Sequence, residues 1–147
     1  MRSMFYNCDS LTSLDLSNFD TSDVTNMRNM FYGCKGLTSL DISNFDTSRV
    51  TNMMSMFKYC DSLTILDVSN FDTSSVISMD NIFKGCNKLG IFYTTSSKWI
   101  DNLPSKTIVA VPKSSGIKYD KLLKSKKDIA KYSLMLSNYK VVAYEEE

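Results

Sequence analysis

A repeat of 26 residues is the feature that most constrains how this chain can fold. The stretch MFYNCDSLTSLDLSNFDTSDVTNMRN at residues 4–29 is followed at once by MFYGCKGLTSLDISNFDTSRVTNMMS at residues 30–55. A third copy begins at Met56, and 15 of the 26 positions are identical across the three copies. A fourth copy keeps IFKGCNKL from Ile82 and then diverges. A period of this length predicts a repeat array in which each unit buries its apolar face only by stacking on its neighbours.

Each repeat carries two apolar patterns. The stretch LTSLDLS spaces its leucines as L-x-x-L-x-L, and the alternation of Leu14 and Leu16 with polar residues predicts a half-buried strand. After the turn-forming stretch NFDTS, apolar residues return at steps of three and four, at Val24, Met27, Met30, Phe31 and Cys34. That spacing predicts one apolar face of a short helix. Strand, turn and helix in 20–29 residues are typical of a leucine-rich repeat.

The fold class predicted is therefore an α/β repeat solenoid of the leucine-rich-repeat type, with one short strand and one short helix in each 26-residue rung and an irregular C-terminal cap. Residues 1–94 are assigned to the solenoid, about three and a half rungs that start in the middle of a repeat. Residues 95–147 are assigned to a C-terminal capping segment that continues the sheet. In that segment SSKWIDNL predicts a helical turn, and TIVAVP and YKVVAY predict strands at 107–112 and 139–144.

The repeat unit SNFDTSxVTNMxxMFxxCxSLTxLDxS resembles the repeat of BspA-like bacterial surface proteins and the related repeat of mycoplasma lipoproteins. The resemblance covers residue 1 to about residue 90. It implies a leucine-rich-repeat solenoid on the cell surface or outside the cell, used for adhesion or other contacts. The same resemblance supplies no catalytic residues.

The residue types exclude most catalytic chemistry. The chain has no histidine, so Ser-His, Cys-His and His-metal sites cannot form. It has no glycine-rich phosphate loop, and its carboxylate pairs arise from a repeated turn. We therefore expect a protein that is not an enzyme and has no cofactor and no metal. Asp15, Asp41 and Asp67 form a like-charge row for which solvation by serine hydroxyls is preferred, with Ca²⁺ as the alternative.

Four cysteines recur at the 26-residue period, at Cys8, Cys34, Cys60 and Cys86. Equivalent positions in adjacent rungs would lie about 4.8 Å apart, but parallel side chains in a ladder make poor disulfide geometry. A zinc site would need its ligands arranged around one point. Buried, reduced thiols are the preferred interpretation over disulfides or a metal.

The outward positions of the predicted strands give the candidate contact surface. They begin as Thr, Ser and Asp and become apolar in the last two copies. The surface consists of Ile65, Asp67, Ile91 and Tyr93, with Asp15 and Asp41 on the same face. An exposed apolar patch in a polar rim is typical of a contact site, although the C-terminal segment could instead fold over it.

Two functions follow from this surface. The first is a module for adhesion or protein contact, with a host or bacterial surface protein or a glycan as partner. The second is a structural stalk or spacer without a ligand, which the near identity of the repeats favours.

Seven lysines between Lys113 and Lys131 are interpreted as a solvated face, so nucleic acid is not an expected partner. No apolar run approaches the roughly 18 residues of a membrane span, so no membrane insertion is expected within this sequence. Because MRSMF at residues 1–5 aligns with MRNMF at residues 27–31, self-association through an uncapped N-terminal end is a further expectation.

Overall fold

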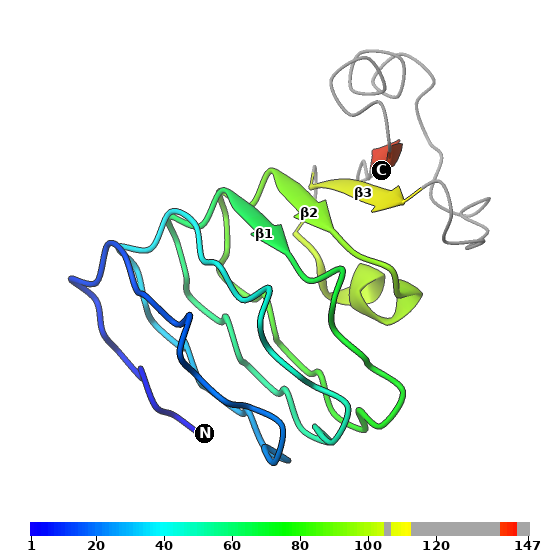
Figure 1. Ribbon diagram of the computed structural model, residues 1–147. Coiled ribbons are helices and arrows are strands. Elements are labelled where there is room, and N and C mark those ends of the chain that lie inside the picture. The colour runs from blue at the N-terminus through cyan, green and yellow to red at the C-terminus, as the bar shows by residue number, and fades with distance from the viewer. Residues whose placement is uncertain (105–106, 113–138, 144–147) are drawn as a thin grey trace.

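The computed structural model describes residues 1–104, 107–112 and 139–143. Its 26-residue copies lie side by side, so that equivalent residues of successive copies are neighbours (Figure 1). The named elements are β1 (Ile65–Asp67), β2 (Ile91–Tyr93), the 3-10 helix η1 (Ser97–Asn102), β3 (Ile108–Pro112) and β4 (Tyr139–Ala143). Within the described part of the chain, no helix is long and apolar enough to cross a membrane.

The first wall of the stack is a sheet with the order β1-β2-β3-β4. β1 pairs with β2, and β2 with β3, in parallel, whereas β4 is antiparallel to β3. Ile65 pairs with Ile91, so the register joins equivalent positions of consecutive repeats. The corresponding segments of the first two repeats form no strand, although the Thr64 N–H donates to the Thr38 carbonyl at 3.0 Å. The strand prediction therefore describes the third and fourth copies and not the first two.

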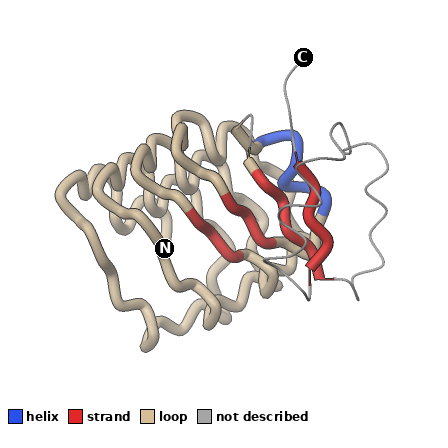
Figure 2. Tube along the Cα trace, turned by 90° about the horizontal axis from the view of Figure 1, so that it is seen from above, coloured by secondary structure: helices blue, strands red, loops and turns tan. Residues whose placement is uncertain are grey.

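The second wall consists of consecutive turns where the sequence predicted helices. Figure 2 draws this part of each repeat as loop, and η1 is the only helix among the described residues. Alternate backbone N–H groups donate to carbonyls of the next repeat, with N···O distances of 2.8–3.1 Å from Met27, Asn29, Phe31 and Gly33 to Asn52, Met54, Met56 and Lys58. The N–H groups between them, such as those of Met30 and Tyr32, donate within their own turn. The same ladder joins the third repeat to the fourth.

The predicted helix fails for a backbone reason. Residues with positive φ recur four apart in this wall, at Asn29 (φ 58) and Gly33 (φ 72) in one repeat and at Ser55 (φ 54) and Tyr59 (φ 62) in the next. A left-handed residue at every fourth position interrupts a right-handed helix. Bonds between repeats satisfy alternate donors that a helix would have satisfied within itself, and bonds within each turn satisfy the donors between them. The side-chain spacing that predicted a helical face is kept by the turns.

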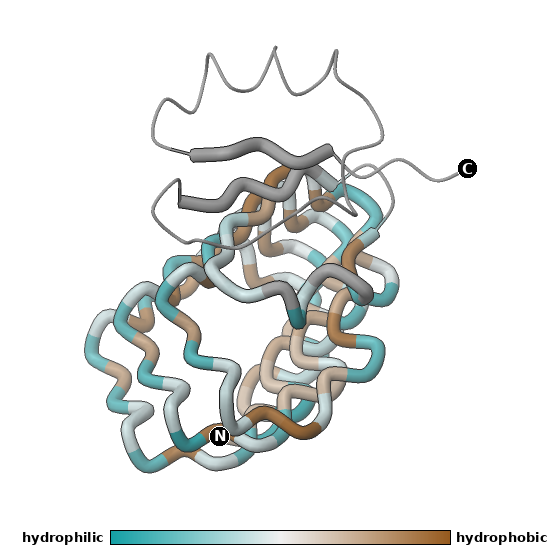
Figure 3. The backbone as a smooth tube through the Cα atoms, turned by 90° about the vertical axis from the view of Figure 1, so that its right-hand side faces the viewer, coloured by the Kyte–Doolittle hydropathy of each residue, from teal (hydrophilic) through white to brown (hydrophobic). Residues whose placement is uncertain are grey.

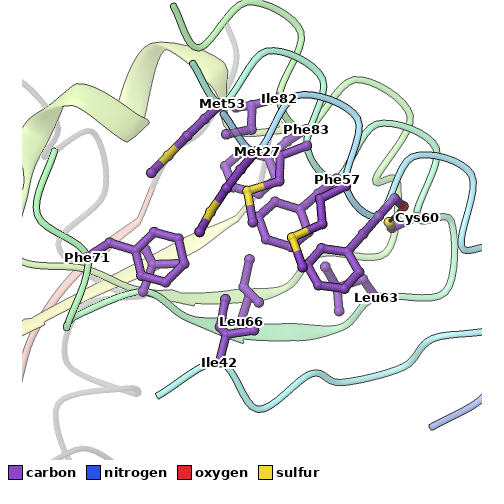
Figure 4. Packing of buried hydrophobic residues seen from close by; sticks show 14 of the residues in the cluster. Met27, Ile42, Met53, Phe57, Cys60, Leu63, Leu66, Phe71, Ile82 and Phe83 are labelled. Carbon is purple, nitrogen blue, oxygen red and sulfur yellow. Dashed lines mark hydrogen bonds between the residues drawn. The ribbon is translucent and has the colours of Figure 1, made fainter. Parts of the chain in front are cut away.

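The core lies between the two walls. Figure 4 shows Phe57, Phe83 and Cys60 entering it from the turn wall, and Ile42 and Leu66 entering it from the sheet wall. Equivalent phenylalanines stack along the array: the ring centroids of Phe5, Phe31, Phe57 and Phe83 follow one another at 5.5, 5.6 and 5.6 Å. Offset or parallel aromatic contacts of this kind add to the gain from burial. The stacked core joins each repeat to the next.

Trp99 closes the core at the C-terminal end of the array. It lies on η1, where the sequence predicted a helical turn, and its side chain is fully buried. Its ring contacts Phe71, Phe83 and Phe92 at centroid distances of 5.9, 5.9 and 5.7 Å. Figure 3 views the molecule from the side on which β3 and η1 lie in Figure 1. β3 and β4 lie where the sequence predicted the two C-terminal strands.

Candidate contact surface on the sheet

Four of the predicted site residues lie together on the outer face of β1 and β2. Ile65 is paired with Ile91 and Asp67 with Tyr93, so the four side chains occupy two register positions that one pair separates. The intervening Leu66 and Phe92 are buried. Ile65 is 38% exposed, whereas Ile91 and Tyr93 are half-buried. The arrangement is an apolar and aromatic patch with a carboxylate at its edge, and we refer to it as the sheet patch.

The sheet patch exists because the third and fourth copies depart from the repeat consensus. Ser13 and Ser39 occupy the position of Ile65 in the first two copies, and Asp41 occupies the position of Tyr93 in the second. These positions are exposed in the first two copies, and the alternation of β1 and β2 sends their equivalents outward in the last two. A row that begins polar therefore ends apolar, over β1 and β2 alone.

Asp67 is held in place by its own backbone. The Ser69 N–H donates to the Asp67 carboxylate at 2.9 Å. The equivalent pairs are Ser17 with Asp15, at 2.9 Å, and Ser43 with Asp41, at 3.0 Å. These are Asx turns, in which a short acidic side chain accepts from the backbone two residues later. The carboxylates of Asp15, Asp41 and Asp67 therefore stabilise turns.

Asp15 and Asp41 lie apart from the sheet patch. They line a cavity of about 160 Å³ between the first two repeats, with Leu14, Leu16, Ser17, Ser43 and Asn44. The Ser17 backbone N–H lowers the pKa of Asp15, and the Ser43 hydroxyl lowers the pKa of Asp41. Serine donors thus solvate the two carboxylates. Among the described residues, no group of three or more His, Cys, Asp or Glu side chains could hold a metal ion.

The C-terminal strands lie beside the sheet patch. Ile108 of β3 pairs with Ile91, and Ala110 pairs with Tyr93, so β3 extends the sheet along the edge of β2. The alternative is that the C-terminal segment folds over the patch, and residues 113–138 of that segment lie outside the described residues. The lysine-rich stretch also lies there.

The cysteines form a column of free thiols. Cys34, Cys60 and Cys86 are buried, and each Sγ donates to a phenylalanine carbonyl of the preceding repeat, at 3.1, 3.1 and 2.9 Å. Burial raises the pKa of the Cys34 thiol to about 11, and a hydrogen bond with Cys86 raises the pKa of Cys60. Cys8 is half-buried because it belongs to the first repeat. The prediction of a buried column of thiols is confirmed for three of the four cysteines.

One structural column was missed by the sequence reasoning. The side-chain amide of Asn44 donates to the carbonyls of Leu16, Ser17 and Phe19 in the preceding repeat, at 2.9, 3.3 and 3.2 Å. Asn70 makes the same three contacts one repeat later, with Ile42, Ser43 and Phe45. The available signal was the invariant asparagine of SNFDTS, which the sequence reasoning treated only as a turn former.

Stacked 26-residue units, joined by backbone ladders and by an asparagine column, define a repeat protein with an outward patch on its sheet. Residues 1–105 match the family model described as Mycoplasma protein of unknown function, DUF285, and the chain belongs to this family. The matched segment contains all four copies, and it agrees with the predicted resemblance to mycoplasma repeat proteins. No curated protein and no solved structure matches the chain.

Proposed function

We propose that the chain is a non-catalytic module of a bacterial cell-surface protein, a solenoid of the leucine-rich-repeat type that makes adhesive or protein–protein contacts through the sheet patch. The observation that carries the proposal is the pairing of Ile65 with Ile91 and of Asp67 with Tyr93 on one outward face. The BspA-like character and the location outside the cell rest on the resemblance of the repeat.

The composition of the sheet patch supports a contact role. Interfaces commonly place apolar and aromatic anchors at the centre and polar groups at the rim. Ile65, Ile91 and Tyr93 supply the anchors, and the Asp67 carboxylate is fixed at the edge by its Asx turn. Such a patch fits a protein partner with a complementary apolar surface and a donor opposite Asp67.

The experiment compares two exposed isoleucines. Ile65→Ala and Tyr93→Ala should each weaken binding to a surface-protein partner by about tenfold or more, since truncation of an anchor commonly costs about 2 kcal/mol. Ile77→Ala is the matched control, because Ile77 is 87% exposed and lies outside the sheet patch. Equal effects of Ile65→Ala and Ile77→Ala on binding would contradict the proposal. Thermal unfolding of each variant checks that the fold is kept.

A structural stalk is the second candidate function, and the near identity of the copies favours it, because 15 of 26 positions are unchanged in three of them. A stalk needs stacking and not a particular outer face. In that case a screen of matrix proteins, glycans and bacterial surfaces gives no binding that depends on Tyr93. Duplicating one repeat of a stalk should then lengthen the stack and leave binding unchanged.

A further inference from the structure

Three tyrosines form a row on the turn wall, on the other side of the core from the sheet patch. Tyr6 and Tyr32 occupy equivalent positions, and their rings stack with centroids 4.7 Å apart. The Tyr59 ring meets the Tyr32 ring edge-on at 5.5 Å. Tyr6 is 46% exposed and Tyr59 is 37% exposed. The tyrosines come from three successive repeats and form one continuous surface.

Tyr59 departs from the repeat at this surface. The equivalent positions hold Asn7, Gly33 and Gly85, residue types that accept a left-handed backbone. Tyr59 has φ 62, a conformation that an aromatic residue adopts only against steric resistance. Local strain of this kind is enriched at functional sites. The repeat consensus is broken here by a residue that adds exposed aromatic surface instead of core.

The fourth repeat leaves space for this ring. A Cβ atom added at Gly85 would lie 2.4 Å from Cδ1 of Tyr59, so the ring lies directly over the Gly85 backbone. The tyrosine row therefore extends from the first repeat to the fourth. A larger residue at Gly85 would displace Tyr59.

The row carries positive charge at its C-terminal end. The Lys58 ammonium lies 5.0 Å from the centroid of Tyr59 and 5.6 Å from that of Tyr32. Lys84 follows Lys58 at the equivalent position of the fourth repeat and is exposed. Within the described residues the ion pairs are Lys35 with Asp9 and Arg49 with Asp23, so neither Lys58 nor Lys84 is neutralised by an ion pair there. The hydrogen bond to Asp9, followed by the charges of Asp9 and Asp61, raises the pKa of Lys35.

We propose that Tyr6, Tyr32, Tyr59, Lys58 and Lys84 form a second contact surface, which binds an extended glycan chain that carries carboxylates. Tyrosine rings offer apolar area for the C–H faces of sugars and hydroxyl groups for their oxygens. The two ammonium groups supply the charge complement of a carboxylate. This surface goes beyond the sheet patch and shares no residue with it.

The backbone of the turn wall favours a glycan over an acidic peptide. A peptide that adds to a protein surface as a strand needs unpaired N–H and C=O groups. Here the Tyr59 N–H already donates to the Lys84 carbonyl at 2.8 Å, and the Gly33 N–H donates to the Lys58 carbonyl at 2.8 Å. Recognition is left to side chains, which suits a ligand with many hydroxyl groups and regularly spaced charges.

The test measures binding of a hyaluronan oligosaccharide to the 147-residue chain by calorimetry, at low and at physiological salt. Affinity should fall as salt rises. Lys58→Gln with Lys84→Gln should weaken binding by about tenfold or more, because charge-assisted hydrogen bonds are lost. Arg49→Gln removes one charge at a site already paired with Asp23 and should change affinity by less than about twofold.

Tyr59→Gly separates a binding role from a structural one. Glycine restores the residue found at positions 33 and 85, so the variant should fold with an unchanged or higher melting temperature. Its affinity for hyaluronan should nevertheless fall by about fivefold or more, as for loss of an aromatic anchor. Tyr59→Asn, which introduces the residue type that the first repeat holds at Asn7, is the second variant if glycine proves too flexible.

Three outcomes would overturn the proposal. One is the absence of hyaluronan binding at low salt, and another is binding that the lysine and Tyr59 variants leave unchanged. The third is equally tight binding of poly-glutamate with the same sensitivity to these variants, which would assign the surface to acidic peptides. Neutral dextran is the charge control and should not bind. Because Ile65 and Tyr93 are untouched, none of these results bears on the sheet patch.

Discussion

Removing the side-chain amide of Asn70 should destabilise the stack of repeats. Its Nδ2 lies 3.2, 3.1 and 3.0 Å from the carbonyl oxygens of Ile42, Ser43 and Phe45. One amide nitrogen carries two hydrogens, so three acceptors share two donors. At a net value of about 0.5–1.5 kcal/mol for each hydrogen bond, Asn70→Ala should lower the free energy of unfolding by about 1–2 kcal/mol. Water can reach the exposed side of the turn, which keeps the loss below the cost for a buried group.

The assay is urea unfolding followed by circular dichroism, with Asn18→Ala as the matched control. Asn18 occupies the same position in the first repeat and is exposed. Within the described residues its amide has no carbonyl partners of the kind that Asn70 has. The control substitution should therefore change stability by less than about 0.5 kcal/mol, as for an ordinary surface site. Equal losses in the two variants would refute the view that the asparagine column joins the repeats.

A second substitution at the same residue tests the direction of the hydrogen bonds. Asn70→Asp replaces the donor by a carboxylate that can only accept, and it faces three carbonyl oxygens. It should destabilise the protein more than Asn70→Ala at neutral pH. The difference should shrink when the carboxyl is protonated below about pH 4. If the Asn70→Asp variant is as stable as the wild-type protein at neutral pH, the Asn70 amide does not donate to these carbonyls.

Three further predictions concern charge, thiols and metal. Hydrogen bonds from serine side chains lower the folded-state pKa of four aspartates, Asp20, Asp41, Asp46 and Asp72. The stability that these hydrogen bonds contribute should therefore be present above the unfolded pKa of about 4 and be lost as the pH falls through the lower folded pKa values. Urea midpoints measured between neutral and acidic pH would show this loss. A thiol reagent without reductant should label Cys8 first in the native protein and all four cysteines after denaturation, whereas two or fewer after denaturation would indicate disulfides. Millimolar calcium or a chelator should leave the melting temperature unchanged, because Ser17 and Ser43 already donate to Asp15 and Asp41; a clear rise with calcium would favour a metal site.

The period of 26 residues determined most of the architecture. Once residues recur at a fixed interval, stacking brings equivalents together, and this explains the phenylalanine column and the column of thiols. The outward position of Ile65 and Tyr93 followed from the alternation within the strand. Departures from consensus were also readable: Tyr59 stands where other copies hold Asn or Gly.

The conformation of the turn wall was decided by tertiary structure. The spacing of Met27, Met30, Phe31 and Cys34 fits both a helix and the observed turns, because either places the same four side chains in the core. A helix satisfies its N–H groups locally, whereas the turns satisfy alternate N–H groups only when another repeat lies alongside. Side-chain periodicity indicates which residues face inward, but it does not indicate which acceptor each backbone N–H group binds. The choice between helix and turn, and the asparagine contacts between repeats, therefore became visible only once neighbouring copies were in place.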